Sequence, residues 1–241
     1  MLLVIRILLI IFIFICICIF GSIYCLFSPR NPSHAAILSR FFCRMTPIFG
    51  IKVEVRQSLK NKLPANCIYI ANHQNNYDLF TCTYAVQPRT ITVGKRSLLW
   101  IPLFGLLYWL TGNFFIDRRN MTRSYNDIVQ IACGIKKNNI SLWIFPEGTR
   151  SRGRGLLPFK TSAFYAAIIA GLPIVPVCVS NLVNKIKLNR WHNGLIIIEI
   201  LTPVEMNIYS ISQVRMVTKY FYNLMKIKID ELNAEVMVRK S

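Results

Sequence analysis

Acidic residues are scarce in this chain of 241 residues, which has 10 Asp and Glu against 29 Lys and Arg and a formal net charge of +19. Such an excess of positive charge suits nucleic acid, or an anionic membrane surface and anionic substrates. The sequence contains no nucleic-acid-binding motif, and its N-terminus is strongly apolar. We therefore expect anionic membrane lipids as partners and no nucleic acid.

Charged residues of either sign are also few, at 16% of the chain against 54% hydrophobic residues. This composition is typical of a membrane-associated protein. The run from Ile7 to Phe27 has 21 residues without a charge, enough to cross a hydrocarbon core of about 30 Å. It lacks a small-x-small cleavage site. More cations follow the run than the single Arg6 that precedes it, which predicts a cytoplasmic location for the rest of the chain.

Several chemical signatures are absent. The eight cysteines include no Cys-x-x-Cys pair and lie mostly in apolar segments, so buried, reduced thiols are expected rather than disulfides. No spacing of His, Cys and carboxylate residues suggests a metal site, and no cofactor is expected. A Gly-x-Ser-x-Gly elbow is missing too, which counts against a serine hydrolase.

A polar cluster follows the apolar run 67–71, which predicts one buried strand. Residues 72–76 are uncharged and polar, and Asn-rich clusters of this kind mark turns. Asp78 then precedes an apolar segment, 79–86, that predicts a helix. His73 therefore lies at the strand end where open α/β sheets bind ligands. A neutral imidazole there can take a proton, and a nearby carboxylate can orient it and stabilise the imidazolium.

Taken alone, His73 and Asp78 fit a helix-capped turn with an incidental histidine equally well. A second polar cluster, Phe145-Pro-Glu-Gly-Thr-Arg-Ser151, decides between these interpretations. Together, Asn72-His73 with Asp78 and this second cluster closely resemble the glycerophospholipid acyltransferase family, above all its bacterial 1-acyl-glycerol-3-phosphate acyltransferases. The resemblance runs along nearly the whole chain.

The resemblance implies transfer of a fatty acyl chain from acyl-CoA or acyl carrier protein to the 2-hydroxyl of 1-acyl-sn-glycerol-3-phosphate (lysophosphatidic acid), forming phosphatidic acid. It also implies a bacterial inner-membrane enzyme whose catalytic domain faces the cytoplasm. His73 fits the general base that takes the proton of the acceptor hydroxyl, and Asp78 would orient it. An acyl thioester is already activated, so a covalent enzyme intermediate is not required. A Cys-His acyl carrier built on Cys67 or Cys82 is the less favoured alternative.

A phosphate on the acceptor needs cations, and the planar guanidinium of Arg150 matches phosphate with paired hydrogen bonds. The resemblance supports further substrate-binding residues, namely Glu147, Gly148, Thr149 and, around the phosphate, Lys95 and Arg118. Glu147 would hold the glycerol hydroxyl or fix Arg150. For each cation the alternative is a solvated surface charge. A basic patch for lipid head groups or for the acyl carrier is expected at Arg152, Arg154 and Lys160.

Periodicity predicts alternating strands and helices. The expected strands cover 51–56, 67–71, 91–96, 112–118, 141–145, 172–180 and 195–201. The expected helices cover 33–49, 79–86, 98–110, 122–137, 159–171 and 211–238. This alternation predicts an α/β fold with a largely parallel sheet flanked by helices. The resemblance implies a mixed sheet and an N-terminal membrane-embedded helical segment.

Three regions are expected: anchoring helices over 1–50, the acyltransferase domain over 51–208 and a C-terminal amphipathic helix over 209–241. Sequence alone does not separate a full membrane span from a half-embedded hairpin. The apolar segment 98–110 fits either a core helix or a surface that meets lipid or an acyl chain. The same fold acting on glycerol-3-phosphate or another lysophospholipid is the closest alternative function, and a non-catalytic binder of anionic lipid is another.

Overall fold

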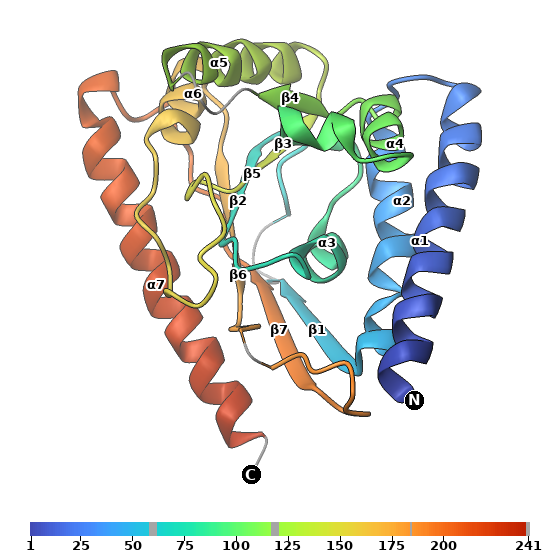
Figure 1. Ribbon diagram of the computed structural model, residues 1–241. Coiled ribbons are helices and arrows are strands. Elements are labelled where there is room, and N and C mark those ends of the chain that lie inside the picture. The colour runs from blue at the N-terminus through green and yellow to red at the C-terminus, as the bar shows by residue number, and fades with distance from the viewer. Residues whose placement is uncertain (58–61, 117–120, 184, 240–241) are drawn as a thin grey trace.

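The structure, a computed structural model, describes residues 1–57, 62–116, 121–183 and 185–239 (Figure 1). A seven-stranded sheet has the order β1-β7-β6-β2-β5-β3-β4. Its strands are β1 (Ile51–Gln57), β2 (Ile68–Ala71), β3 (Thr90–Lys95), β4 (Phe114–Ile116), β5 (Ser141–Ile144), β6 (Ile174–Val179) and β7 (Gly194–Ile200). Strands β6 and β7 pair antiparallel, and the other neighbours pair parallel. The predicted mixed, largely parallel sheet is confirmed.

Helices cover both faces of this sheet. They are α1 (Leu2–Leu26), α2 (Ser33–Cys43), α3 (Asp78–Thr81), α4 (Phe104–Leu110), α5 (Met121–Lys137), α6 (Ser162–Ala170) and α7 (Val214–Val238). Every residue of β2, β5 and β6 is buried, as expected for parallel strands with helices on both sides. Alternate side chains serve two cores: Tyr69 packs with α1–α4, whereas Ile68 and Ile70 pack with α5–α7.

The apolar segment 98–110 is not the single helix that its composition suggested. A 3₁₀ turn covers Arg96–Trp100, and α4 begins only at Phe104. Pro102 separates them because its ring and missing N–H interrupt a helix. Leu107 is buried as in a core helix, while Trp100 is 85% exposed. Contact of this segment with lipid or an acyl chain stays a prediction. Two other expected helices are shorter, since α2 ends at Cys43 and α3 spans a single turn.

The N-terminal helix α1 packs against the domain along its length. The ring of Phe14 lies 5.9 Å from that of Phe42 in α2 and 5.7 Å from that of Phe104 in α4. Its outer face exposes apolar side chains. Among the described helices, α1 is the one long and apolar enough to cross a membrane. The helix starts before the uncharged run, so Arg6 lies inside it. The division at residues 50 and 208 stays a prediction.

Candidate active site

His73 and Asp78 meet where β2 ends and α3 begins. The Nδ1 atom of His73 lies 2.6 Å from Oδ2 of Asp78. The same carboxylate oxygen accepts the backbone N–H groups of Gln74 at 2.6 Å and Asn75 at 3.1 Å. The carboxylate therefore caps the polar turn and faces the imidazole at once. A hydrogen bond from Nδ1–H to Asp78 leaves a lone pair on Nε2, the tautomer that a general base needs.

The imidazole is held on its other side by an aromatic ring. The rings of His73 and Phe145 stack with centroids 4.0 Å apart at 16°. The side chain of His73 is 13% exposed, and its Nε2 makes no hydrogen bond to the described part of the chain. The arrangement thus fixes the ring while keeping one nitrogen available for a proton.

Two buried amide side chains hold the polar turn against β6. Asn72 donates to the carbonyl oxygen of Val179 and accepts its N–H, both at 2.9 Å. Gln74 donates to the carbonyl oxygen of Ser180 at 2.9 Å and accepts the N–H of Leu182 at 2.7 Å. These bonds fix the backbone on both sides of His73. The sequence alone offered no sign of this role for Gln74, because its hydrogen-bond partners lie more than a hundred residues further along the chain.

Glu147 joins the second polar cluster to the first. Its Oε1 accepts the backbone N–H of His73 at 2.6 Å, and its Oε2 accepts that of Leu157 at 2.9 Å. Burial raises the pKa of Glu147 to about 7. The N–H of Ser151 also donates to the carbonyl oxygen of His73 at 2.9 Å. The two clusters, which lie more than sixty residues apart in the sequence, are therefore side by side, joined by the side chain of Glu147 and by a backbone hydrogen bond.

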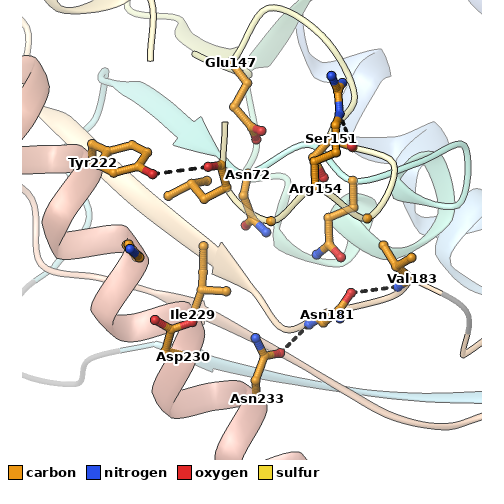
Figure 2. A pocket seen from close by; sticks show the side chains of 15 residues that line it. Asn72, Glu147, Ser151, Arg154, Asn181, Val183, Tyr222, Ile229, Asp230 and Asn233 are labelled. Atoms are coloured by element: carbon orange, nitrogen blue, oxygen red, sulfur yellow. Dashed lines mark hydrogen bonds between the residues drawn. The ribbon is translucent and has the colours of Figure 1, made fainter. Parts of the chain in front are cut away.

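Two cavities lie beside this edge of the sheet. A polar cavity has a volume of about 370 Å³ and is lined by Asn72 and Glu147 together with Tyr222, Asp230 and Asn233 of α7. Figure 2 shows these side chains. The second cavity, of about 450 Å³, is lined mainly by apolar residues and by two arginines, Arg150 and Arg152. It also touches the turn that follows His73, through Asn75, Asn76 and Tyr77. We refer to this second space as the apolar cavity.

The other predicted substrate-binding residues are distributed unevenly. Arg150 lines the apolar cavity, and its Nε is buried without a hydrogen-bond partner in the described ranges. Gly148 has a φ of 68°, and a Cβ there would lie 2.8 Å from Cε of Lys160. Thr149 is exposed. Lys95, at the end of β3, is exposed and lines neither cavity. Arg118 lies outside the described residues.

The cysteines near His73 are poor nucleophiles here. Burial raises the pKa of Cys67 to about 11 and that of Cys82 well above its usual value. The thiolate is the reactive form of cysteine, so both stay neutral thiols near pH 7. Across the described residues, no group of three or more His, Cys, Asp or Glu side chains is placed to hold a metal ion.

Comparison with known proteins assigns the fold and the two clusters to one family. A family model described as acyltransferase matches residues 51–180, a span that contains both clusters. The chain is 55% identical over 241 residues to the 1-acyl-sn-glycerol-3-phosphate acyltransferase of Escherichia coli (strain K12), covering 100% of this chain and 98% of the relative. This chain belongs to the acyltransferase family. The Haemophilus influenzae protein of the same name is 52% identical over 236 residues, covering 98% of each chain.

More distant proteins also resemble this acyltransferase. The human 1-acyl-sn-glycerol-3-phosphate acyltransferase alpha is 32% identical over 182 residues, which cover 75% of this chain and 64% of the human one. The crystal structure of the 1-acyl-sn-glycerophosphate (LPA) acyltransferase from Thermotoga maritima has a TM-score of 0.74, at 24% identity, and covers 97% of this chain and 98% of its own. The fold is therefore shared along nearly the full length, including the N-terminal helix.

Proposed function

We propose that this acyltransferase transfers a fatty acyl chain from acyl-CoA or acyl carrier protein to the 2-hydroxyl of 1-acyl-sn-glycerol-3-phosphate, forming phosphatidic acid. The name of the bacterial relatives at 52% and 55% identity supports this acceptor. The observation that carries the proposal is the 2.6 Å contact between His73 and Asp78 beside a cavity that combines apolar walls with two arginines, Arg150 and Arg152. A single-chain phospholipid has both an acyl chain and a phosphate for such a cavity.

The proposed reaction uses His73 as general base. Its Nε2 takes the proton of the acceptor 2-hydroxyl while that oxygen forms a bond to the thioester carbonyl carbon. The carbon–sulfur bond then breaks, and the thiolate leaves with the electron pair. The imidazolium returns its proton to the thiolate or to solvent. Asp78 stabilises the imidazolium through the Nδ1–H bond, and general-base assistance of this kind contributes about 10²–10⁴ in rate.

Arg150 is the proposed ligand of the acceptor phosphate. Its Nε is buried without a partner in the described ranges, and a buried guanidinium donor gains most from a charged acceptor. Arg150 precedes Ser151, whose N–H donates to the carbonyl oxygen of His73. We therefore propose that the phosphate on Arg150 and the hydroxyl at His73 belong to one acceptor molecule. Lys95 and Arg118 are proposed to act around the same phosphate.

The remaining residues of the second cluster have proposed roles in shaping the acceptor site. Both oxygens of Glu147 already accept backbone N–H groups, so we propose that it acts by holding His73 and its own turn in place. Gly148 supplies the positive φ of that turn. Thr149 is exposed next to Arg150, where its hydroxyl is available to the acceptor head group.

We also propose that the enzyme sits on the bacterial inner membrane, with its catalytic domain facing the cytoplasm. The exposed apolar face of α1 supports the anchor, and residues 1–53 contain no Asp or Glu. Cations without neighbouring acids favour a surface of anionic lipids. Because both ends of α1 contact the domain, a shallow, half-embedded position suits it better than an isolated span.

A purified-protein assay that crosses two donors with several acceptors tests this function. Acyl-CoA and acyl carrier protein thioesters would each be offered with lysophosphatidic acid, glycerol-3-phosphate and a lysophosphatidylcholine. We expect phosphatidic acid from lysophosphatidic acid as the dominant product. A preference for glycerol-3-phosphate or for the choline lipid would instead assign another acceptor to the same fold. Lipid binding without turnover on any acceptor would identify a non-catalytic protein.

A further inference from the structure

Arg6 is a buried charge in an otherwise uncharged helix, α1. The residue is 6% exposed. Its guanidinium donates to the carbonyl oxygens of Leu188 and Trp191 at 3.1 Å each, and also to that of Arg190. Its Cζ lies 5.7 Å from the ring centroid of Trp191. A buried charge requires such partners, so Arg6 ties the first turn of α1 to this loop of the domain.

The loop that receives Arg6 is itself held against the core. The side chain of Asn193 donates to the carbonyl oxygens of Phe49 at 2.7 Å and Lys187 at 3.0 Å. Gly50 has a φ of 68°, and a Cβ at that position would collide with the carbonyl oxygen of Trp191. The loop is thus fixed at several points, and Arg6 holds α1 to a support that is itself held in place.

The helix face next to Arg6 forms one wall of the apolar cavity. Ile7, Ile10 and Ile11 line that cavity, with the i, i+3, i+4 spacing of a single helix face. Leu188 accepts a hydrogen bond from Arg6 and lines the same cavity. The contacts of this guanidinium group therefore help to fix the N-terminal end of the wall, while Phe14 packs the helix against α2 and α4 further along.

The cavity behind this wall has the chemistry of the acceptor rather than of the donor. Arg150 and Arg152 share it with the isoleucines of α1. Lysophosphatidic acid places an anionic phosphate and an acyl chain on one glycerol, whereas in acyl-CoA the whole pantetheine arm separates the phosphates from the acyl chain. We infer that the first turns of α1 are a wall of the acceptor site, and that Arg6 is the positioning residue that holds this wall. The inference rests on the function proposed above.

Arg6→Leu tests this inference in the full-length protein, assayed in phospholipid vesicles of fixed composition. The substitution keeps the helix apolar and removes the three hydrogen bonds. We expect the KM for lysophosphatidic acid to rise about tenfold, an effect typical of one lost apolar contact in a pocket. The KM for the donor and kcat should change by less than about twofold, because the lost contact concerns acceptor binding. The acceptor KM of Arg6→Lys should lie between those of the wild type and Arg6→Leu, since lysine keeps the charge but cannot reproduce the planar fork of hydrogen-bond donors.

Arg40→Leu is the matched control, because Arg40 is an exposed cation on the neighbouring helix α2 and lines neither cavity. It should leave both KM values unchanged. Equal acceptor KM values for Arg6→Leu and Arg40→Leu would overturn the inference and leave Arg6 as a purely structural contact. Flotation with vesicles should recover the Arg6→Leu protein with the membrane as fully as the wild type.

If Arg6→Leu fails to fold, Ile10→Trp tests whether α1 lines the acceptor site. This substitution keeps Arg6 and fills part of the apolar cavity instead. We expect it to favour lauroyl over oleoyl lysophosphatidic acid by about tenfold relative to the wild type. An unchanged preference between the two acceptors would show that α1 does not line the acceptor site. The wild type is assayed first: failure to acylate lysophosphatidic acid refutes the proposed function, and the variants are then compared on the acceptor that it does use.

Discussion

The Oε1 atom of Glu147 accepts the backbone N–H of His73 at 2.6 Å. The proposed base is therefore attached to the turn that precedes Arg150, the proposed phosphate ligand. Leu157 donates to the other oxygen of the same carboxylate, so one buried side chain connects three segments of the chain. The distance between the base and the phosphate site consequently depends on a residue that need not touch the substrate.

The pH dependence of stability should reveal the buried state of Glu147. Burial raises its pKa from the ordinary 4.5 to about 7. Between these pH values the folded protein holds a proton that the unfolded chain has released, so this carboxyl makes the protein less stable as pH rises. Glu147→Gln removes that titration and leaves one of two N–H groups unpaired. The stability gap between wild type and variant should therefore shrink from about pH 5 to about pH 8.

Thermal unfolding at both pH values measures this gap. Glu205→Gln is the control, because Glu205 is exposed. The difference in stability between this variant and the wild type should be small at both pH 5 and pH 8. A gap for Glu147→Gln that is constant or widens with pH would contradict a raised pKa at this position.

Replacing His73 by alanine should stop turnover and leave the protein folded. The imidazole supplies the Nε2 lone pair, and its loss should lower kcat by about 10²–10⁴. The backbone bonds of His73 to Glu147 and Ser151 do not need the side chain, so circular dichroism should be unchanged. His192→Ala, at an exposed histidine, should keep wild-type turnover. A folded His73→Ala enzyme with nearly normal kcat would refute the assignment of the base.

Asp78→Asn should act through the charge beside His73. The Oδ2 atom makes all three contacts of this carboxylate, so an asparagine oxygen in its place would accept the N–H groups of Gln74 and Asn75 and still face Nδ1, but without a negative charge. The imidazolium that forms during the proposed reaction would then lose its stabilising carboxylate. We expect a fall in kcat of about 10²–10⁴. The double variant with His73→Ala should be no slower than His73→Ala alone, because the two residues act as a unit. Additive losses in the double variant would argue for separate roles.

The sequence was most informative about the strands. Runs such as Ile68–Ala71 and Ile174–Val179 are apolar throughout because both faces of these parallel strands are covered. The turn after β2 was also predictable, since its polar residues follow the strand directly. His73 and Asp78 are five residues apart, so local pattern was enough to suggest their contact.

The contacts that span the chain were not predictable in this way. Arg6 bonds to a loop 182 residues away, and from the sequence alone it counted only as a charge that precedes the apolar run. Gln74 and Glu147 bond to backbone groups, which leave no pattern of residue types at the partner's position. Pro102 is the exception, because a helix breaker inside an apolar run is visible in the local sequence.

The outer face of α1 should determine membrane association. Leu8, Phe12 and Phe20 are among its most exposed apolar side chains. Each contributes about 1.5–3 kcal/mol when it is buried in an apolar environment, so replacing all three by serine should lower vesicle binding by more than about a hundredfold. Ile208→Ser with Met237→Ser is the control, at exposed apolar residues outside the helix. Unchanged flotation of the triple variant would locate the anchor elsewhere.

The substitution Arg150→Lys should weaken the acceptor selectively. A lysine keeps the positive charge but supplies a point charge in place of a planar fork with paired donors. A hydrogen bond to a charged group contributes about 1.5–3 kcal/mol, and losing one corresponds to about a ten- to hundredfold lower kcat/KM for lysophosphatidic acid. Kinetics with acceptor and donor varied separately measure the change.

The donor should respond much less to this substitution, because its reacting end is a neutral thioester. Arg154→Lys is the matched control: Arg154 lines the polar cavity rather than the apolar one and bonds to the carbonyl oxygens of Arg150 and Ser151. It should leave the acceptor KM within about twofold, since it removes no contact in the apolar cavity. An Arg150→Lys enzyme that bound acceptor normally and lost donor affinity would assign Arg150 to the carrier, and the phosphate would then need another ligand.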